Sequence, residues 1–344
     1  MSEISNEDFC AIFVDMGTSN TRVWFMRGND ILSRAAKAIG VRHTAQDKSA
    51  IRIESGLKEL ITEVVVQAGQ SIGSCTPRCV GAVGMISSPL GLRELPHVCT
   101  PAGPEELTAS SRWFEFPEIA EFPFLLVPGV RSGSAALGLN SLDRADVMRG
   151  EETLCLGLSA LGLLKLPGLV LNLGSHWKAI EIDAQGRIIR SISSLAGELI
   201  NAAKTHTILA SSVSRHWPSR LTRQWLEAGM NEQRRSGLTR ALYCVRLLEV
   251  GKDGTPEDRF SFLLGAFIAA DLDMLKAHEL LHEEMQVVIS GNVAVAEAWR
   301  DALAQMSITA LILTGDQIER ALLVGLKHIV FQCYRRRKSE HPPN

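Results

Sequence analysis

The sequence predicts an α/β protein of two similar lobes, each with a mixed sheet that opens in a β-meander. Three observations carry this prediction. Short apolar runs alternate with helical patterns along the chain. Two segments, beginning near residues 11 and 169, share the order strand, tight turn, strand, turn, strand. The length of 344 residues suits two or three domains of ordinary size.

The first meander occupies residues 11–36. An apolar run at 11–15 is followed by a turn of small polar residues and by a second strand at 21–26. A further turn leads into a third strand at 31–36. Two successive hairpins form an antiparallel meander, which argues against a dinucleotide-binding βαβ unit, because there the first glycine-rich turn opens a helix.

The second meander repeats the first 157 positions later. Its strands are predicted at 169–172, 177–183 and 187–192. Asp15-x-Gly17-Thr18 thus corresponds to Asn172-x-Gly174-Ser175. An offset near half the chain indicates two duplicated domains rather than a solenoid, whose repeats are about 20–50 residues long.

The remaining segments complete the two lobes. Helical spacing is found at 57–67, 151–165, 220–228, 238–249, 259–281, 293–306 and 317–331. Further strands are predicted at 79–85, 286–290 and 307–313, of which 286–290 is of the buried type. We therefore expect one lobe at 1–165, a second at 166–333 and a frayed basic tail at 334–344.

Composition and charge argue against several classes of protein. Hydrophobic residues make up 46% and charged residues 22%, as in globular rather than disordered chains. A net charge of −2 gives no overall basic field for nucleic acid, and no apolar stretch is long enough for a membrane span. The acidic N-terminus lacks the layout of a signal peptide. Seven cysteines do not suggest a disulfide framework, and Cys75 and Cys79 lack the second pair of a structural zinc site, so we expect a reducing cytoplasm.

The two hairpin turns have the chemistry of a phosphate clamp. A tight Gly-Thr-Ser turn presents backbone N–H groups in one concavity, and hydroxyl and amide side chains add donors. Asp15 ends the first strand, where it could hold Mg²⁺, an ion that proteins bind through few carboxylates. Ordinary turn geometry explains one such turn, but two of the same kind favour phosphate binding. The residues predicted for this role are Gly17, Thr18, Ser19, Asn20, Gly174 and Ser175.

Several motifs resemble those of a known family. Asp15-Met-Gly-Thr-Ser-Asn-Thr-Arg22 is similar to the first phosphate motif of sugar kinases, Hsp70 and actin. Asp146-Val-Met-Arg-Gly-Glu-Glu-Thr153 resembles the Met-Arg-Gly-Glu-Glu-Thr signature of the 2-dehydro-3-deoxygalactonokinases. Further segments follow in the order of that family, at 84–91, 174–178, 197–199 and 315–316. The resemblance covers residues 12–329.

This resemblance implies a two-lobed sugar kinase/Hsp70/actin fold with a ribonuclease H-like core in each lobe. It also implies transfer of the γ-phosphoryl group of Mg·ATP to the 6-hydroxyl of 2-dehydro-3-deoxy-D-galactonate, in galactonate or galactose breakdown. ATP would then lie between lobes that close on the sugar. The expected partners are the sugar acid and ATP, and we expect binding to neither nucleic acid nor a membrane. Whether the protein forms a homodimer is left open.

Glu151 is the candidate catalytic acid or base near the attacking hydroxyl. In related sugar kinases an acid at a helix N-terminus, between the two phosphate motifs, takes this role, and Glu151 directly precedes an apolar helix. Glu152 and Asp146 are the alternatives, and acids in a first helical turn also stabilise the helix without any catalytic role. Arg149, the second predicted catalytic residue, could bind a substrate carboxylate with its two-pronged guanidinium or form a surface ion pair.

Sugar contacts are expected from both halves of the chain. His176 and Lys178 alternate along a strand, so both should face the cleft if one does. Glu198, after the second meander, could hold a substrate hydroxyl. Ser87 and Ser88 lie in the motif at 84–91, and we expect them to contact the sugar as well.

Adenosine contacts are expected where two apolar strands run into helices. Glycines at these points let the backbone approach a flat ligand closely, although every α/β domain contains such turns. The residues predicted for adenosine are Gly291, Asn292, Gly315 and Asp316.

The chain departs from the family pattern at several positions. Asn172 replaces the usual Asp, Pro89 and Leu92 alter the loop at 87–92, and Asp271 stands for a Glu. Ser175 replaces Thr but keeps the hydroxyl. The altered loop leaves open the alternative that the protein is a kinase for another sugar acid. Asn172 and Pro89 leave open a non-catalytic regulator that binds nucleotide or sugar acid on the same fold.

Overall fold

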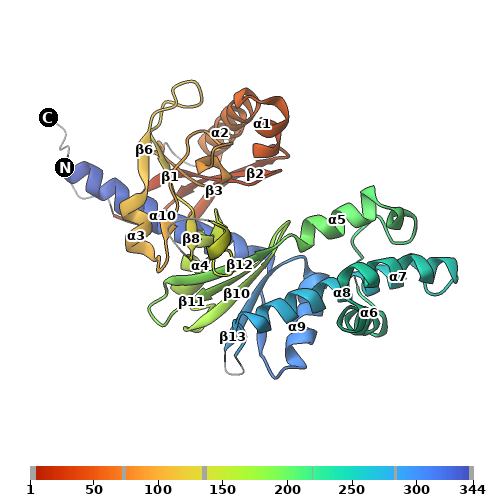
Figure 1. Ribbon diagram of the computed structural model, residues 1–344. Helices are drawn as coiled ribbons and strands as arrows, with labels where there is room; N and C mark the ends of the chain where they lie inside the picture. Colours follow the sequence, from red (N-terminus) through yellow and green to blue (C-terminus); the bar gives the residue numbers. More distant parts are fainter. Residues whose placement is uncertain (1–4, 72–74, 134–137, 219, 283–284, 341–344) are drawn as a thin grey trace. The chain divides into compact units, whose positions relative to one another are not determined.

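The computed structural model describes residues 5–71, 75–133, 138–218, 220–282 and 285–340 (Figure 1). The chain divides into two compact units. Unit 1 comprises residues 1–163, 186–189 and 316–344, and unit 2 comprises residues 164–185 and 190–315. Each unit has its own hydrophobic core.

The main sheet of unit 1 has six strands in the order β3-β2-β1-β4-β7-β6. Its first three strands form the antiparallel meander that the sequence predicts, and β4 and β7 add in parallel before β6 closes the edge antiparallel. The bounds are β1 (Cys10–Met16), β2 (Thr21–Arg27), β3 (Asp30–Lys37), β4 (Val80–Gly84), β6 (Arg112–Phe114) and β7 (Phe124–Leu126).

Helices and a small second sheet complete unit 1. The long helix α2 (Ile51–Ser71) buries residues at helical spacing, such as Ile53, Leu57 and Leu60, in the same core as β1 and β2. The strands β5 (Val98–Cys99), β8 (Val130–Ser132) and β9 (Asp146–Met148) form the small sheet. The other helices are α1 (Val41–Asp47), η1 (Met85–Ser87), α3 (Pro104–Ser110), η2 (Leu139–Ser141), α4 (Glu151–Ala160) and α10 (Gly315–Glu340).

The sheet of unit 2 repeats this plan in the order β12-β11-β10-β13-β14. Its strand β10 pairs antiparallel with β11 and in parallel with β13, as β1 does with β2 and β4. The duplicated architecture is therefore confirmed. The bounds are β10 (Gly168–Leu173), β11 (Trp177–Ile182), β12 (Ile188–Ser194), β13 (Gln286–Gly291) and β14 (Ala310–Ile312).

Helices inserted between β12 and β13 enlarge unit 2. The central helix α8 (Pro256–Ala277) is buried along most of its length, and α6 (Arg223–Ser236) packs along it. Its N-terminus has a capping box, in which Thr255 and Asp258 satisfy each other's backbone N–H groups. The remaining helices are α5 (Ala196–His206), η3 (Ile208–Ser211), α6 (Arg223–Ser236), α7 (Leu238–Val250) and α9 (Val293–Ala304).

The last helix, α10, belongs to unit 1 and not to the second lobe, where we expected it. Its Glu319 accepts a hydrogen bond from the Trp24 indole (2.8 Å), and Phe331 packs edge-on against Phe9 (ring centroids 5.2 Å apart). The helix continues to Glu340, so described residues of the expected frayed tail are helical, while 341–344 lie outside the described residues. Helical periodicity identifies a helix but does not say which sheet its apolar side covers.

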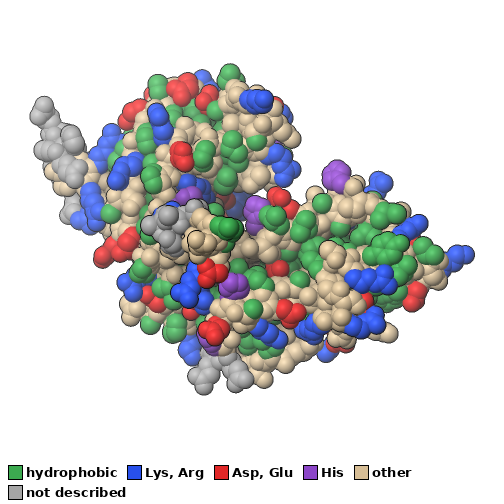
Figure 2. Space-filling model, in the orientation of Figure 1, with side chains coloured by type: hydrophobic (Ala, Val, Ile, Leu, Met, Phe, Trp, Pro, Cys, Tyr) green, Lys and Arg blue, Asp and Glu red, His purple; other side chains and the backbone are tan. Residues whose placement is uncertain are grey.

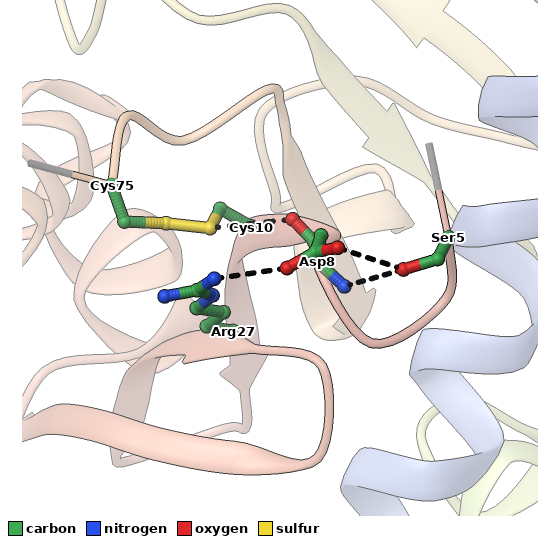
Figure 3. The surroundings of a disulfide bond; sticks show 5 residues. All are labelled: Ser5, Asp8, Cys10, Arg27 and Cys75. Atoms are coloured by element: carbon green, nitrogen blue, oxygen red, sulfur yellow. Dashed lines mark hydrogen bonds and ion pairs between the residues drawn. A yellow bond between two sulfur atoms is a disulfide. The ribbon is translucent and has the colours of Figure 1, made fainter. Parts of the chain in front are cut away.

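A disulfide joins Cys10 to Cys75 within unit 1 (Figure 3). It links the first residue of β1 to the segment after α2, with a sequence separation of 65 residues and Cα atoms 6.5 Å apart. One bond is not a disulfide framework, but the cysteine spacing did not predict it, because Cys75 was considered only together with Cys79 as a zinc pair. The Cys79 thiol is free and buried, and its burial raises its pKa to about 12.

No helix within the described ranges is long and apolar enough to cross a membrane.

Candidate active site

The first of the two turns predicted to bind phosphate lies between β1 and β2 in unit 1. Four residues separate the paired positions Met16 and Thr21. The Gly17 N–H donates to the Asn20 carbonyl (2.8 Å) and so closes the turn. Gly17 therefore shapes the turn. The other donors of the predicted set are on Asn20, which is exposed, and on Thr18 and Ser19, which are partly exposed.

Backbone N–H groups at the N-terminus of α1 donate to the carbonyls of this turn. The Arg42 N–H donates to the Thr18 carbonyl (2.9 Å). A Cβ at Gly40 would lie 2.4 Å from the Gly17 carbonyl oxygen, so only glycine permits this approach. With its carbonyls bound to α1, the turn is rigid, which is what a preformed anion site requires.

Asp15 lies beside this turn with its carboxylate only 16% exposed. One oxygen, Oδ2, accepts from both the Nη2 (2.5 Å) and the Nε (3.2 Å) of Arg22. The other, Oδ1, faces two glycines with positive φ, Gly84 (+86°) and Gly150 (+109°). A Cβ at Gly84 would lie 3.3 Å from Oδ1, so the two glycines keep space open beside this oxygen.

This arrangement fits Mg²⁺ held through a single protein carboxylate. Mg²⁺ keeps several of its waters and binds through one or two carboxylates together with substrate phosphates. In the described part of the chain, no three His, Cys, Asp or Glu residues cluster closely enough to hold a metal by themselves. Phosphate oxygens and water would therefore complete the shell around an ion on Asp15.

Glu152, one alternative for the catalytic base, is fully buried. Both of its carboxylate oxygens accept from the Gly150 N–H (2.9 and 2.8 Å) at the start of α4. Burial, followed by the charge of Glu151, raises the pKa of Glu152 to about 8. Glu152 thus holds Gly150 at the start of α4. Glu151, its neighbour on the helix, is partly exposed.

Arg149 is hydrogen bonded to the last residue of η1 and to the loop that follows it. Its Nη1 donates to the Ser87 hydroxyl (3.0 Å), and its Nη2 donates to the Leu95 carbonyl (2.8 Å). Burial lowers the pKa of the guanidinium, and the nearby carboxylates of Glu152 and Glu94 oppose that effect. Arg149 therefore does not simply form a surface ion pair. Its guanidinium is also not wholly free to bind a substrate carboxylate, because two of its nitrogens already donate to Ser87 and Leu95.

Ser87 and Ser88 are buried, contrary to the direct sugar contact expected of them. The Ser87 hydroxyl donates to the Gly84 carbonyl (3.2 Å) while it accepts from Arg149, and the Ser88 hydroxyl donates to the Met85 carbonyl (2.7 Å). Both hydroxyls shape the loop. The sequence motif identifies the loop, but it does not say which way each side chain turns.

The second turn predicted to bind phosphate repeats the first in unit 2. Gly174, Ser175 and His176 join β10 to β11 and are exposed. The Glu198 N–H, in the first turn of α5, donates to the Ser175 carbonyl (2.8 Å). A Cβ at Gly197 would lie 2.2 Å from the Gly174 carbonyl oxygen. Gly197 and Gly174 follow Gly40 and Gly17 by the same 157 positions, so the duplication includes the helix that supports the turn.

His176 and Glu198 form a half-exposed pair, with 3.4 Å between Nε2 and Oε1. Lys178, expected on the same face as His176, is buried instead, and its Nζ donates to the Ser193 hydroxyl (2.6 Å). The alternation argument fails here because His176 lies in the turn, whereas β11 begins at Trp177.

Asp271 on α8 supports the second turn indirectly. Its carboxylate accepts from the Ser194 hydroxyl (2.6 Å), and that hydroxyl accepts from the Ala196 N–H (3.3 Å) at the start of α5. Burial raises the pKa of Asp271 to about 6, and the Ser194 hydrogen bond opposes the shift. In the sequence Asp271 stands out only as a replacement for Glu, because its place beside α5 depends on long-range packing.

The residues predicted for adenosine follow neighbouring parallel strands. Because β10, β13 and β14 are parallel neighbours, the second turn, Gly291 and Gly315 lie at the same sheet edge. The Asn292 side chain accepts from the N–H groups of Ala294 and Val295 and caps α9, so its oxygen is engaged. Asp316 falls in unit 1, whereas the other three fall in unit 2. Asn172, at the position of Asp15, accepts from the Ser290 hydroxyl (2.9 Å) at the same edge.

Comparisons with known proteins agree with this two-unit plan. The most similar solved structures include a protein from Sinorhizobium meliloti assigned as a 2-dehydro-3-deoxygalactonokinase, with a TM-score of 0.71, 20% identity, and coverage of 97% of this chain and 100% of that one. An activator of 2-hydroxyisocaproyl-CoA dehydratase from Clostridium difficile, solved with ADPNP, has a TM-score of 0.52, 12% identity, and coverage of 98% and 100%. These likenesses confirm the two-lobed sugar kinase/Hsp70/actin fold.

The sequence comparisons are more specific. The 2-dehydro-3-deoxygalactonokinase of Escherichia coli K12 is 24% identical over 327 residues, which cover 93% of this chain and 98% of that protein. The family model for 2-keto-3-deoxy-galactonokinase matches residues 15–329, from the Asp15 turn to the last helix. A match over that span, with both β-hairpin turns inside it, shows that this sugar kinase belongs to the 2-keto-3-deoxy-galactonokinase family.

Proposed function

We propose that the protein transfers the γ-phosphoryl group of Mg·ATP to the 6-hydroxyl of 2-dehydro-3-deoxy-D-galactonate. The observation that carries the proposal is the family match over residues 15–329. The packing of the Gly150–Glu151 segment beside Asp15 supports it, because that segment brings an acid to the first phosphate turn. The substrate named for the Escherichia coli relative is the same sugar acid.

In this proposal Glu151 accepts the proton of the 6-hydroxyl as the oxygen attacks the γ-phosphorus. The bond from the γ-phosphorus to the oxygen that bridges to ADP breaks, and ADP leaves. Glu151 is preferred to Glu152 because both oxygens of Glu152 are held by the Gly150 N–H inside the protein. Bound Mg²⁺ would neutralise phosphate charge, and Asp15 is the residue that would hold it.

Phosphate binding is proposed for the donors of both turns, on Thr18, Ser19 and Asn20 and on Ser175. Gly17 and Gly174 allow the tight path of each turn. We propose that the adenosine lies beside Gly291 and Gly315, which are at the same sheet edge as the second turn. Asn292 contributes by fixing the start of α9, because its side chain caps that helix.

Sugar recognition is proposed for the exposed pair His176 and Glu198, which offers hydrogen bonds to hydroxyl groups. Arg149 is proposed to hold the loop at 87–97 beside Glu151 through Ser87 and Leu95, and to leave its remaining N–H groups for the substrate carboxylate. Because this loop contains the departures Pro89 and Leu92, a different sugar acid is the second candidate substrate.

A coupled ADP-release assay with a panel of 2-keto-3-deoxy sugar acids and plain hexoses tests the proposal. We expect turnover with 2-dehydro-3-deoxy-D-galactonate and little with hexoses. Turnover with another sugar acid alone would transfer the assignment to that substrate. ATP binding without any turnover would favour the non-catalytic regulator.

The proposal includes the cellular setting. We place the reaction in the cytoplasm, in galactonate or galactose breakdown, because ATP and a phosphorylated sugar acid are intracellular metabolites. Deletion of the gene should then block growth on galactonate while growth on glucose continues.

A further inference from the structure

Arg149, Ser87 and Leu95 form a closed ring of hydrogen bonds in unit 1. The Arg149 guanidinium donates through Nη1 to the Ser87 hydroxyl (3.0 Å) and through Nη2 to the Leu95 carbonyl (2.8 Å). The Leu95 N–H in turn donates to the Ser87 carbonyl (3.0 Å). Because Ser87 and Leu95 are buried, water does not compete for these bonds, and the ring fixes the guanidinium.

The same serine connects Arg149 to the surroundings of Asp15. The Ser87 hydroxyl donates to the Gly84 carbonyl (3.2 Å). A Cβ at Gly84 would lie 3.3 Å from Asp15 Oδ1. Gly150, the residue after Arg149, also packs against Gly84, since a Cβ at Gly150 would lie 3.5 Å from the Gly84 Cα. These adjacent contacts join the segment before α4 to the end of β4, directly beside Asp15.

The stem of the Arg149 side chain is enclosed as well. A Cβ at Gly129 would lie 2.4 Å from Arg149 Cγ and 2.2 Å from the Met148 carbonyl oxygen, so only glycine lets the side chain pass at this point. The Gly129 carbonyl accepts from the Val98 N–H (2.9 Å), which ties it to β5. With its stem and its guanidinium already held, Arg149 loses little conformational entropy when a ligand binds to it.

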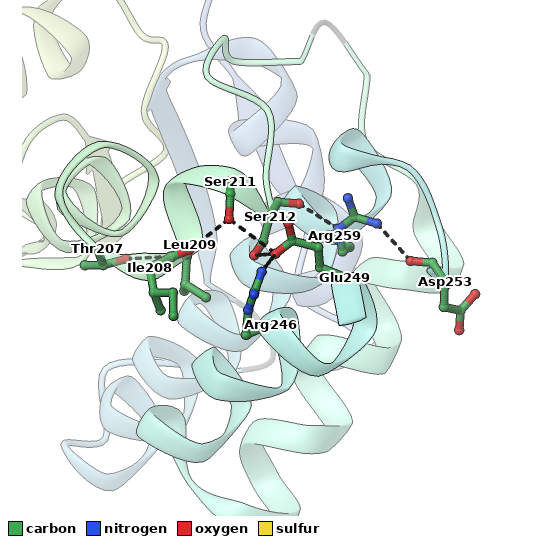
Figure 4. A network of polar contacts seen from close by, with 9 residues as sticks. All are labelled: Thr207, Ile208, Leu209, Ser211, Ser212, Arg246, Glu249, Asp253 and Arg259. Carbon is green, nitrogen blue, oxygen red and sulfur yellow. Dashed lines mark hydrogen bonds and ion pairs between the residues drawn. The ribbon is translucent and has the colours of Figure 1, made fainter. Parts of the chain in front are cut away.

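Arg149 differs from the surface arginines and from a structural arginine of this protein. Figure 2 shows Lys and Arg side chains spread over the visible surface, where water solvates their charge. Arg259, in contrast, is 7% exposed and donates to the carbonyls of Ser212 and Asp253 within a polar network of unit 2 (Figure 4). Arg149 is partly exposed, so its guanidinium is neither fully solvated nor closed to a ligand.

The hydrogen-bond partners of Arg149 are neutral groups. They are a hydroxyl, a carbonyl and, at 3.5 Å, the His97 Nδ1, and within the described ranges no Asp or Glu forms an ion pair with this guanidinium. Burial lowers its pKa, and the charges of Glu152 and Glu94 oppose that effect. A guanidinium has five N–H donors, so some remain for a ligand. A partly desolvated cation with unused donors suits a carboxylate, which it can bind through parallel hydrogen bonds.

We propose that Ser87 is a specificity-determining positioning residue, which fixes Arg149 for the carboxylate of the substrate and holds it at a set place beside Asp15. The inference rests on the proposed function in taking a sugar acid as the ligand. Arg149 contacts the carboxylate, and Ser87 acts through Arg149. A neutral sugar gains nothing from this guanidinium, so the preference for sugar acids over neutral sugars depends on Ser87.

Calorimetry with 2-dehydro-3-deoxy-D-galactonate, and with a neutral analogue in which an alcohol replaces the carboxylate, tests the inference. Ser87→Ala should weaken binding of the acid by about tenfold, because a hydrogen bond to a charged group is lost. Binding of the neutral analogue and the KM for ATP should change by less than about twofold. Ser88→Ala is the matched control, since the Ser88 hydroxyl is also buried but donates to the Met85 carbonyl, and it should keep the preference for the acid.

Arg149→Lys tests whether Ser87 acts through Arg149, because an ammonium group does not replace the planar fork of a guanidinium. In the Arg149→Lys background, Ser87→Ala should have little further effect on binding of the acid. A further loss of about tenfold in the double variant overturns the proposal. So do equal losses in Ser87→Ala and Ser88→Ala, or a wild-type protein that binds no sugar acid.

The binding comparison also separates this inference from the proposed function. A wild-type protein that binds the sugar acid without turnover contradicts the proposed function, while the Ser87 and Ser88 variants still decide the role of Ser87. Melting curves identify any variant that fails to fold. Ser87→Cys then replaces Ser87→Ala, since a thiol fills nearly the same space and is a weaker acceptor.

Discussion

Asp15 divides its carboxylate between Arg22 and the open space beside Gly84 and Gly150. Asp15→Asn keeps the size of the side chain and removes the charge that would hold Mg²⁺, so we expect turnover to be abolished while the fold is kept. Steady-state kinetics and circular dichroism measure the two effects. Arg22→Gln is the control, because it breaks the ion pair and leaves the carboxylate; it should keep most of the activity. Equal losses in both variants would mean that Asp15 acts only through the ion pair.

Glu151 and Glu152 are adjacent in sequence, yet one is partly exposed and the other is fully buried. Glu151→Gln should lower kcat by at least about 10²-fold with little change in KM for ATP, because only the transition state is affected. Glu152→Gln should keep most of kcat. Steady-state kinetics on both variants decide the assignment. If only the Glu152 variant loses kcat, the two roles are exchanged. If neither variant loses kcat, Asp146 and Glu198 are the next candidates for the base.

The raised pKa of Glu152 predicts a pH-dependent stability. A carboxyl with a pKa of about 8 in the folded protein and an ordinary pKa of 4.5 binds more protons when folded, so folding stability falls as the pH rises between these values. Glu152→Gln removes this dependence and keeps an oxygen that can accept from Gly150. Melting curves from about pH 5 to about pH 9 should show the variant gaining on the wild type as the pH rises. A constant difference would contradict a buried, titrating Glu152.

At the scale of elements, α10 crosses α4 at two glycines. A Cβ at Gly325 would lie 2.0 Å from the Thr153 carbonyl oxygen, and a Cβ at Gly157 would lie 1.7 Å from the Ala321 carbonyl oxygen. These contacts place α10 in unit 1 and hold α4, the helix that begins with Glu151.

This close packing predicts opposite effects for two Gly→Ala substitutions in helices. Gly325→Ala should destabilise the protein by about 1–3 kcal/mol, because the new methyl group forces the helices apart. Gly69→Ala in α2, where nothing lies within 4 Å, should stabilise it by about 0.5–1 kcal/mol through helix propensity. Chemical denaturation measures both. Stabilisation by Gly325→Ala would show that α4 and α10 do not pack closely.

At the scale of the whole molecule, the two units share a plan but differ in what reinforces them. Unit 1 contains the Cys10–Cys75 bond and α10, whereas unit 2 has the inserted helices α6 to α8. The disulfide bond of unit 1 joins β1, the strand that contains Asp15, to the segment after α2. The counterpart of β1 in unit 2, β10, has no such bond.

The disulfide predicts a unit-specific response to reduction. Closing a loop of this length stabilises a fold by about 4 kcal/mol in the chain-entropy treatment. Reductant should therefore speed hydrogen exchange in β1 and α2, while β10 and α5 serve as the internal control. Peptide mapping without reductant should find the linked peptide and five free thiols. Seven free thiols would mean that the bond does not form.

The sequence by itself determined the features that depend on neighbouring residues. Both meanders, the 157-residue repeat and the two turns follow from apolar runs and small polar residues within about 25 positions. The predicted helix at 238–249 is α7 almost to the residue. The helix expected at 151–165 ends at Ala160, because Gly162 with φ of +66° terminates it. The Arg-Gly-Glu-Glu motif was also located correctly at the start of a helix.

Only the tertiary structure decided which side chains are available for chemistry. It buries Glu152, Lys178, Ser87 and Ser88, and it brings Asp271 to α5 and Cys10 to Cys75. It also packs α10 on unit 1, although the chain enters that helix from unit 2. The physical reason is the same in each case. Periodicity reports how a residue is placed within its own element, whereas burial and hydrogen-bond partners come from elements that are distant in the sequence.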